Sequence, residues 1–174
     1  MNKSSFLLIL ISTLVACGFH LRGTRGDYYK FPFETVYVEC DNVIICSNFT
    51  TAIVTESLAA LVTKPENAEV MIKLMNEQTS RDIAGLNSVG RISSYLLTYQ
   101  AQAEVWQKGE QVGNDINVTS RMTMQYNDAT ILSNTQEEAN FWDQIHENAT
   151  NQLIMRLIHF PYRKYSLDNV AESK

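Results

Sequence analysis

The sequence lacks several features that would define an enzyme, a membrane span or a nucleic-acid-binding protein. It has no glycine-rich phosphate loop and no nucleophile elbow. Its three histidines, His20, His146 and His159, lie far apart and fit no metal-ligand spacing. Its formal net charge of −5 argues against nucleic acid as a partner. We therefore expect no enzymatic activity, no cofactor and no metal site.

The longest apolar run lies at the N-terminus and is too short to cross a bilayer, which needs about 20 apolar residues. Lys3 precedes it, the run extends over residues 6–15, and the small Ala16 stands directly before Cys17. This order of charge, apolar stretch and small residue predicts a secretory signal peptide over residues 1–16. Leu14-Val15-Ala16-Cys17 resembles the bacterial lipobox, in which the cysteine is lipidated (palmitate). The alternative is an ordinary signal peptide followed by a chance cysteine.

The remaining chain predicts one domain with a short leader and a short tail. Residues 17–33 are expected to form a lipidated N-terminus and tether, because they have little apolar periodicity. Residues 34–161 are expected to form a single α+β domain. Residues 162–174 are expected to be a polar, disordered C-terminal tail.

Cysteine is scarce, and its count is informative. If Cys17 carries lipid, Cys40 and Cys46 remain as a pair. Export into an oxidising compartment favours a disulfide between them, which would contribute roughly 2 to 3 kcal/mol in the chain-entropy model. The alternative is two free, partly buried thiols.

Hydrophobic periodicity predicts the elements of the domain. Alternating residues predict strands, and the 47–62 stretch has a wide apolar stripe typical of a helix that ends at Lys64-Pro65. Thr135 and Glu138 fit a capping box that starts a second helix, which Pro161 stops. The expected elements are strands at 34–40, 68–78, 95–106 and 116–126, helices at 47–62 and 135–160, a loop at 82–90 and a hairpin turn at 108–110.

This pattern predicts an α+β fold: a mixed four-stranded sheet with two amphipathic helices packed on one face, in the order strand-helix-three strands-helix. The other face is expected to carry Tyr95, Leu96 and Trp106, which is apolar for a solvated surface. Such a face suggests a covering partner.

Two arginines bracket the expected loop between the second and third strands. Arg81 and Arg91 could hold phosphate groups through bidentate hydrogen bonds. The alternative is that both are ordinary solvated arginines at strand ends.

Three blocks of the sequence resemble the LptE family of lipopolysaccharide-assembly lipoproteins. They are Ala16-Cys17-Gly18-Phe19-His20-Leu21-Arg22-Gly23, the Gly90-Arg91-x-x-x-Tyr95 motif, and the end of the last helix over residues 149–157. The strand-helix-three strands-helix order is the fold that this resemblance implies.

The resemblance also implies a function. Proteins of this family are anchored in the outer membrane, plug the β-barrel protein LptD, help it assemble and help move lipopolysaccharide to the outer leaflet. Arg91 matches a basic position to which lipopolysaccharide binding is attributed in the family. The sequence departs from the family in the loop 127–134, which has no basic residue. The alternative function is a lipid-binding periplasmic carrier lipoprotein without a barrel partner, and a periplasmic hydrolase is a third, more distant reading.

Overall fold

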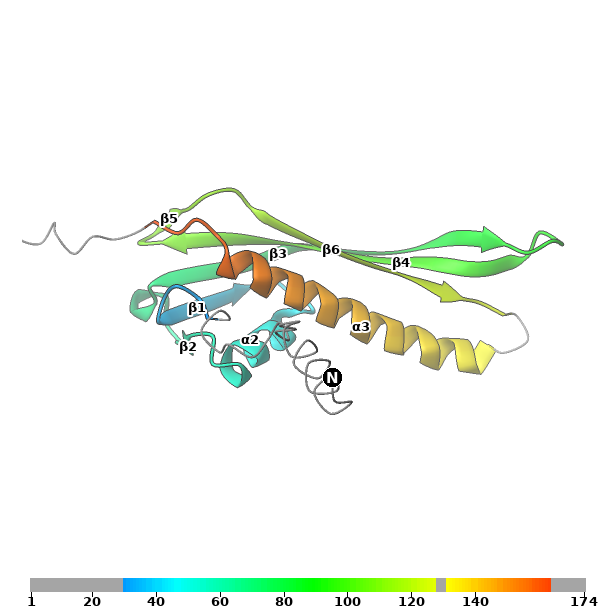
Figure 1. The fold of residues 1–174 in the computed structure, drawn as a ribbon, viewed down its shortest axis with the longest axis horizontal. Helices are drawn as coiled ribbons and strands as arrows, with labels where there is room; N and C mark the ends of the chain where they lie inside the picture. The colour runs from blue at the N-terminus through cyan, green and yellow to red at the C-terminus, as the bar shows by residue number, and fades with distance from the viewer. Residues whose placement is uncertain (1–29, 128–130, 164–174) are drawn as a thin grey trace, which may run out of the picture.

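The fold is one curved sheet with two helices on the same face (Figure 1). The computed structural model describes residues 30–127 and 131–163. The strands are β1 (Thr35–Cys40), β2 (Ala60–Leu61), β3 (Val70–Leu86), β4 (Ile92–Gln107), β5 (Glu110–Gln111) and β6 (Ile116–Gln125). The helices are α2 (Cys46–Thr55), the short 3₁₀ helix η1 (Pro65–Asn67) and α3 (Ile131–Ile158).

The sheet is mixed, as the sequence predicts. Its order is β2-β1-β3-β4-β5, and β6 pairs with β4. β1 is parallel to β2 and β3, whereas the β3–β4, β4–β5 and β4–β6 pairs are antiparallel. The prediction of four strands in the order strand-helix-three strands-helix is wrong, because the sheet has six strands. The two additional strands, β2 and β5, have two residues each and are too short to produce an alternating pattern.

The first helix is shorter than its apolar stripe suggests. α2 ends at Thr55, and Ser57 takes a left-handed backbone conformation (φ 53°) that turns the chain. Leu58 remains buried after the turn, and β2 then pairs with β1. The expected helix over 47–62 is therefore wrong beyond Thr55, because the left-handed turn at Ser57 and the pairing of β2 with β1 end the helix although the apolar residues continue.

The largest difference from expectation is the β3–β4 hairpin. The expected loop over 82–90 is strand as far as Leu86, so β3 has 17 residues and β4 has 16. A register shift between Met75 and Gln78 moves the following side chains of β3, as far as the next shift after Ile83, to the other face. This shift breaks the alternation that sequence analysis relies on. The hairpin extends beyond the start of α3 as a long arm, at the right of Figure 1.

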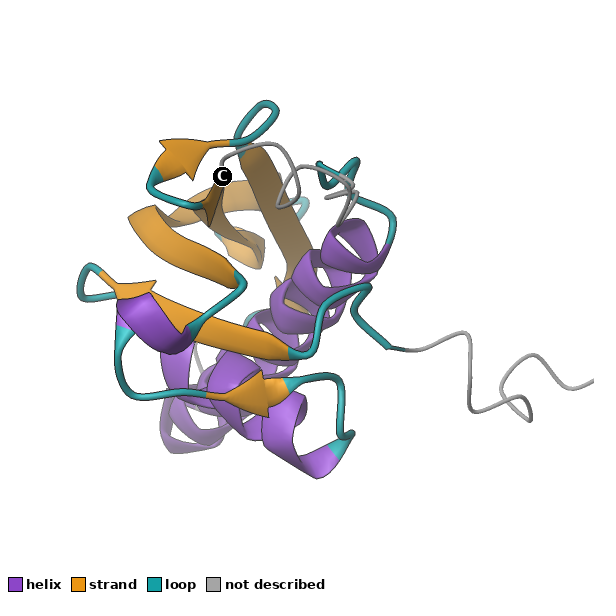
Figure 2. Ribbon diagram, turned by 90° about the vertical axis from the view of Figure 1, so that its left-hand side faces the viewer, coloured by secondary structure: helices purple, strands orange, loops and turns teal. Residues whose placement is uncertain are grey.

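The C-terminal helix lies along the sheet. α3 begins at Ile131, so Thr135 lies inside the helix and the predicted capping box is wrong. Its buried stripe is Ile145, Ala149, Leu153 and Leu157, spaced for one helix face. Figure 2 shows α2 and α3 on the same side of the sheet, which confirms the predicted α+β arrangement with two helices.

Residues on both sides of the predicted domain boundaries belong to the core. Phe31 and Phe33, in the expected tether, are buried and stack on each other. Tyr162, in the expected tail, packs against Phe33 and donates a hydrogen bond to the Leu157 carbonyl (2.9 Å). Burial raises the pKa of Tyr162 above its ordinary value.

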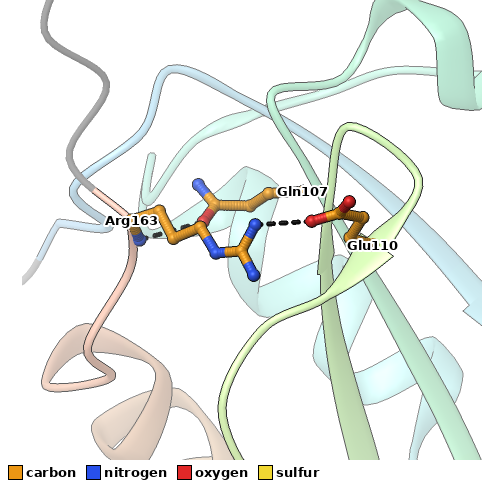
Figure 3. Close-up of polar contacts among 3 residues, drawn as sticks. All are labelled: Gln107, Glu110 and Arg163. Carbon is orange, nitrogen blue, oxygen red and sulfur yellow. Dashed lines mark hydrogen bonds and ion pairs between the residues drawn. The ribbon is translucent and has the colours of Figure 1, made fainter.

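Arg163 fixes the end of the described chain to the β4–β5 turn. Its backbone N–H donates to Gln107 Oε1 (3.0 Å), and its guanidinium lies 2.6 Å from the Glu110 carboxylate (Figure 3). The rest of the expected tail, residues 164–174, lies outside the described residues, as do the expected signal peptide and Cys17.

Candidate functional site at the hairpin tip

The tip of the β3–β4 hairpin is a tight turn organised by Asn87. The Asn87 side-chain oxygen accepts hydrogen bonds from the backbone N–H groups of Val89 (3.1 Å) and Arg91 (2.9 Å). Gly90 has φ +79°, which glycine adopts without steric cost. These bonds hold the backbone on both sides of the turn and fix where the Arg91 side chain leaves the tip.

Arg91 is exposed at the tip, directly before β4. Its backbone is held by Asn87, whose N–H donates to the Arg91 carbonyl (2.8 Å). An exposed guanidinium on a rigid turn can bind phosphate oxygens through two parallel hydrogen bonds. The phosphate-binding role that the sequence suggests for Arg91 stays a prediction.

Arg81 has a different setting. Its guanidinium lies 3.1 Å from Glu138 of α3 and 3.9 Å from the ring centroid of Tyr95. Arg81 pairs with Leu97 in the β3–β4 ladder, whereas the tip begins after the Leu86–Ile92 pair. Five residues of strand separate these pairs, a distance of about 17 Å. The two candidate arginines therefore do not converge on one site, and Arg81 mainly connects the hairpin to α3.

Three large apolar side chains lie exposed around the tip, and the sequence patterns did not single them out. Ile83 is 59 %, Leu86 61 % and Val89 75 % exposed. Clustered exposed apolar residues mark contact surfaces more often than isolated ones. The sequence contained an indication of this surface, because three large apolar residues are unusual in a solvated loop over 82–90.

The helix-free face of the sheet is more polar than expected. Tyr95 lies on the helix side, because it shares a register position with the fully buried Met124 and its ring contacts Arg81. Leu96 and Trp106 are half-buried and stand ten residues apart on β4. Between them are Thr98, Gln100, Gln102 and Glu104. The expected apolar face is therefore wrong, because one of its three residues turns to the other side.

A small polar cluster lies between the sheet and α3. Tyr99 of β4 and His146 of α3 meet edge to face, with ring centroids 4.9 Å apart. Tyr99 Oη and His146 Nε2 are buried and have no hydrogen-bond partner of normal geometry among the described residues. Burial, with the Glu77 carboxylate nearby, raises the pKa of Tyr99. Burial lowers the pKa of His146 below its ordinary value, although Glu77 and Asp143 oppose this.

The disulfide lies next to this cluster. Cys40 at the end of β1 is joined to Cys46 at the start of α2, as the sequence predicts. Inside the closed loop, the Ile44 N–H donates to both carboxylate oxygens of Glu77 (3.1 and 3.2 Å). The disulfide therefore fixes the loop that contacts Glu77, which lies at the register shift of β3.

The described residues give little support for other kinds of site. Residues 30–127 and 131–163 contain no group of three or more side chains able to hold a metal ion. Within the same residues, no helix combines the length and apolar character needed to cross a membrane. The loop before α3, where a second basic residue was expected, falls largely outside the described side chains.

The fold and the tip together define a small α+β domain with a projecting hairpin. The family model of LptE, described as Lipopolysaccharide-assembly, matches residues 33–157. This chain belongs to the LptE family. No curated protein matches the sequence.

Several solved lipoproteins share the fold. The solution structure of uncharacterized lipoprotein B from Nitrosomonas europaea has a TM-score of 0.67 and 25% identity, over 82% of this chain and 92% of that one. The crystal structure of rare lipoprotein B from Shewanella oneidensis has a TM-score of 0.60 and 12% identity, over 72% and 92%. A minor lipoprotein from Acinetobacter baumannii has a TM-score of 0.61 and 14% identity, over 74% and 93%. The family is one of non-enzymatic lipoproteins, and membership supports a role in lipopolysaccharide transport and outer-membrane assembly.

Proposed function

We propose that this protein is an outer-membrane lipoprotein that plugs and helps assemble an LptD-like β-barrel, and so takes part in moving lipopolysaccharide to the outer leaflet. The observation that carries the proposal is the family match over residues 33–157. A plug must be rigid and must present a large surface to the barrel. The sheet with α3 along it, and the Cys40–Cys46 bond that fixes β1 to α2, suit that requirement.

Membrane attachment is part of the proposal. Residues 1–16 act as the signal peptide, and Cys17 carries the lipid. Residues 17–33 link the anchor to the domain, whose folded part begins by Phe31 because that side chain is buried. The domain then faces the periplasm or lies inside the barrel lumen.

The tip is the proposed contact with lipopolysaccharide. Arg91 supplies a cation for phosphate groups, and Ile83, Leu86 and Val89 supply exposed apolar surface for acyl chains. A ligand with both chemistries fits a surface on which a guanidinium stands beside apolar side chains. Arg81 supports the hairpin through Glu138 and contributes to the ligand indirectly.

The test of the barrel partner is affinity isolation of the full-length, C-terminally tagged protein from detergent-solubilised outer membranes. We expect an LptD-family barrel in stoichiometric amount, identified by mass spectrometry. An unrelated outer-membrane lipoprotein with the same tag is the control. Repeated absence of a barrel would contradict the proposal, and lipid bound to the barrel-free protein would favour the periplasmic carrier instead.

A further inference from the structure

The outer edge of β6 has a regular row of unpaired backbone groups. β6 pairs with β4 from Ser94–Gln125 to Ala103–Ile116 without a register shift. The Tyr126 N–H donates to the Ser93 carbonyl (2.9 Å), one position beyond this ladder. In an antiparallel pair, residues alternate between bonding inward and pointing away. Even-numbered residues of β6 therefore bond to β4, and odd-numbered residues point outward.

A second observation agrees with this assignment. Arg156 of α3 donates a hydrogen bond to the carbonyl of Asn117, an outward-facing position. In the described residues, β6 pairs with no strand other than β4. The outward backbone groups of Thr119, Arg121, Thr123 and Gln125 thus face away from the sheet, beyond the position that Arg156 caps.

This edge has few of the features that usually prevent strand addition. Proteins protect sheet edges by very short strands, proline, bulges or several charges. β6 has ten residues, no proline, no bulge and one charge, Arg121. On the other side of the sheet, β2 has two residues, and the part of β3 beyond Leu74 that β1 does not cover has register shifts and the charged residues Arg81 and Asp82. β6 is therefore the long edge with the fewest protecting features, and we call it the open edge.

The chemistry of the open edge identifies its ligand. Donor and acceptor pairs repeat every second residue, roughly 7 Å apart, and an extended polypeptide matches this spacing. A second copy of this chain is disfavoured. Antiparallel pairing centred on Arg121 would place two Arg121 side chains directly opposite each other, and like charges in that position destabilise a strand pair.

We propose that β6 binds an extended segment of the barrel partner by strand addition over residues 119–125. The segment adds a strand next to β6 and carries acidic or hydroxyl side chains opposite Arg121. This proposal rests on the proposed function, since it names the surface through which the barrel is held. The hairpin tip remains free to contact lipid.

Proline at an outward position tests the proposal, because it removes an N–H that the isolated protein does not use in its sheet. Full-length Thr123→Pro, with Thr123→Ala as its matched control, is isolated from outer membranes with its barrel. We expect Thr123→Pro to lower barrel recovery at least tenfold and Thr123→Ala to keep it, while both keep the wild-type melting temperature. Wild-type barrel recovery by a folded Thr123→Pro would overturn the proposal.

Hydrogen exchange of the wild-type protein gives an answer that depends on no variant. Amides of Thr119, Arg121, Thr123 and Gln125 should exchange at least tenfold more slowly in the barrel complex than in the free protein. Equal exchange in both would overturn strand addition and leave the plug function intact. If the wild-type protein recovers no barrel at all, both proposals fail.

Discussion

The Arg81 guanidinium lies 3.1 Å from the Glu138 carboxylate and so joins the projecting hairpin to α3. Arg81 is also stacked 3.9 Å over the Tyr95 ring, which restricts the guanidinium to this position. The contact is the outermost ion pair along the hairpin in the described residues, before the exposed tip. It therefore sets how firmly the tip is held relative to the rest of the domain.

A double-mutant cycle measures this contact. Arg81→Ala and Glu138→Gln, alone and together, are compared by urea unfolding. The side chains are 39 % and 23 % exposed, so we expect a coupling energy of about 0.2 to 1 kcal/mol, the range of partly solvated pairs. Additive effects of the two substitutions would mean that the ion pair does not hold the hairpin.

Arg91→Asp should weaken binding of purified lipopolysaccharide at least tenfold and leave the melting temperature unchanged. The charge reversal places a carboxylate where phosphate is proposed to bind, while an exposed tip residue contributes little to the core. Lys64→Asp is the matched control, with the same change of charge at an exposed position outside the hairpin. Unchanged binding by Arg91→Asp would remove this residue from the proposed site.

Loss of the disulfide should destabilise the domain. Cys40→Ser/Cys46→Ser opens the seven-residue loop and is expected to lower the free energy of unfolding by about 2 to 3 kcal/mol. Thiol titration of the denatured wild-type protein should find neither cysteine free. Two reactive thiols from Cys40 and Cys46, or a variant as stable as the wild type, would contradict the expectation.

His146 should make stability depend on pH. Burial lowers its pKa in the folded state below the ordinary value of 6.5, so the unfolded chain binds a proton first as pH falls. Well above pH 6.5, His146 is neutral in both the folded and the unfolded protein and makes no pH-dependent contribution to stability. The free energy of unfolding then decreases as pH falls through 6.5 toward the pKa of His146 in the folded protein. Comparing wild type with His146→Gln at about pH 7.5 and 5.5 cancels the shared carboxylates.

The expected result for His146 is a difference in unfolding free energy that changes between the two pH values, with the wild type losing more stability at the lower one. A difference that stays constant with pH would show that the side chain titrates equally in the folded and unfolded protein. His146 would then be a structural residue of the Tyr99 cluster without a role in acid sensitivity.

The sequence predicted the parts of the fold that rest on local periodicity. β1, β4, β6 and most of α3 are near their expected positions, because their alternation or helical stripe is uninterrupted. The pattern failed at Ser57 and between Met75 and Gln78, where a left-handed residue and a register shift change the direction of the side chains. Neither event has a glycine or proline to mark it in the sequence.

The candidate site was predicted in part. Arg91 stands exposed at a turn, as the sequence suggested, because Gly90 marks that turn. Arg81 was expected beside it, but the longer strand carries it away from the tip and next to Glu138. The apolar residues Ile83, Leu86 and Val89 became a candidate surface once the loop proved to be a hairpin.

By itself, the sequence determined the α+β class, the family, the cysteine pair and the likeness to an exported lipoprotein. These follow from residue order, composition and short motifs, which need no long-range contact. The tertiary structure alone decided which arginine is exposed, which face of the sheet Tyr95 occupies and which sheet edge is open. Those outcomes depend on strand register and helix placement, and both are set by contacts between residues far apart in the chain.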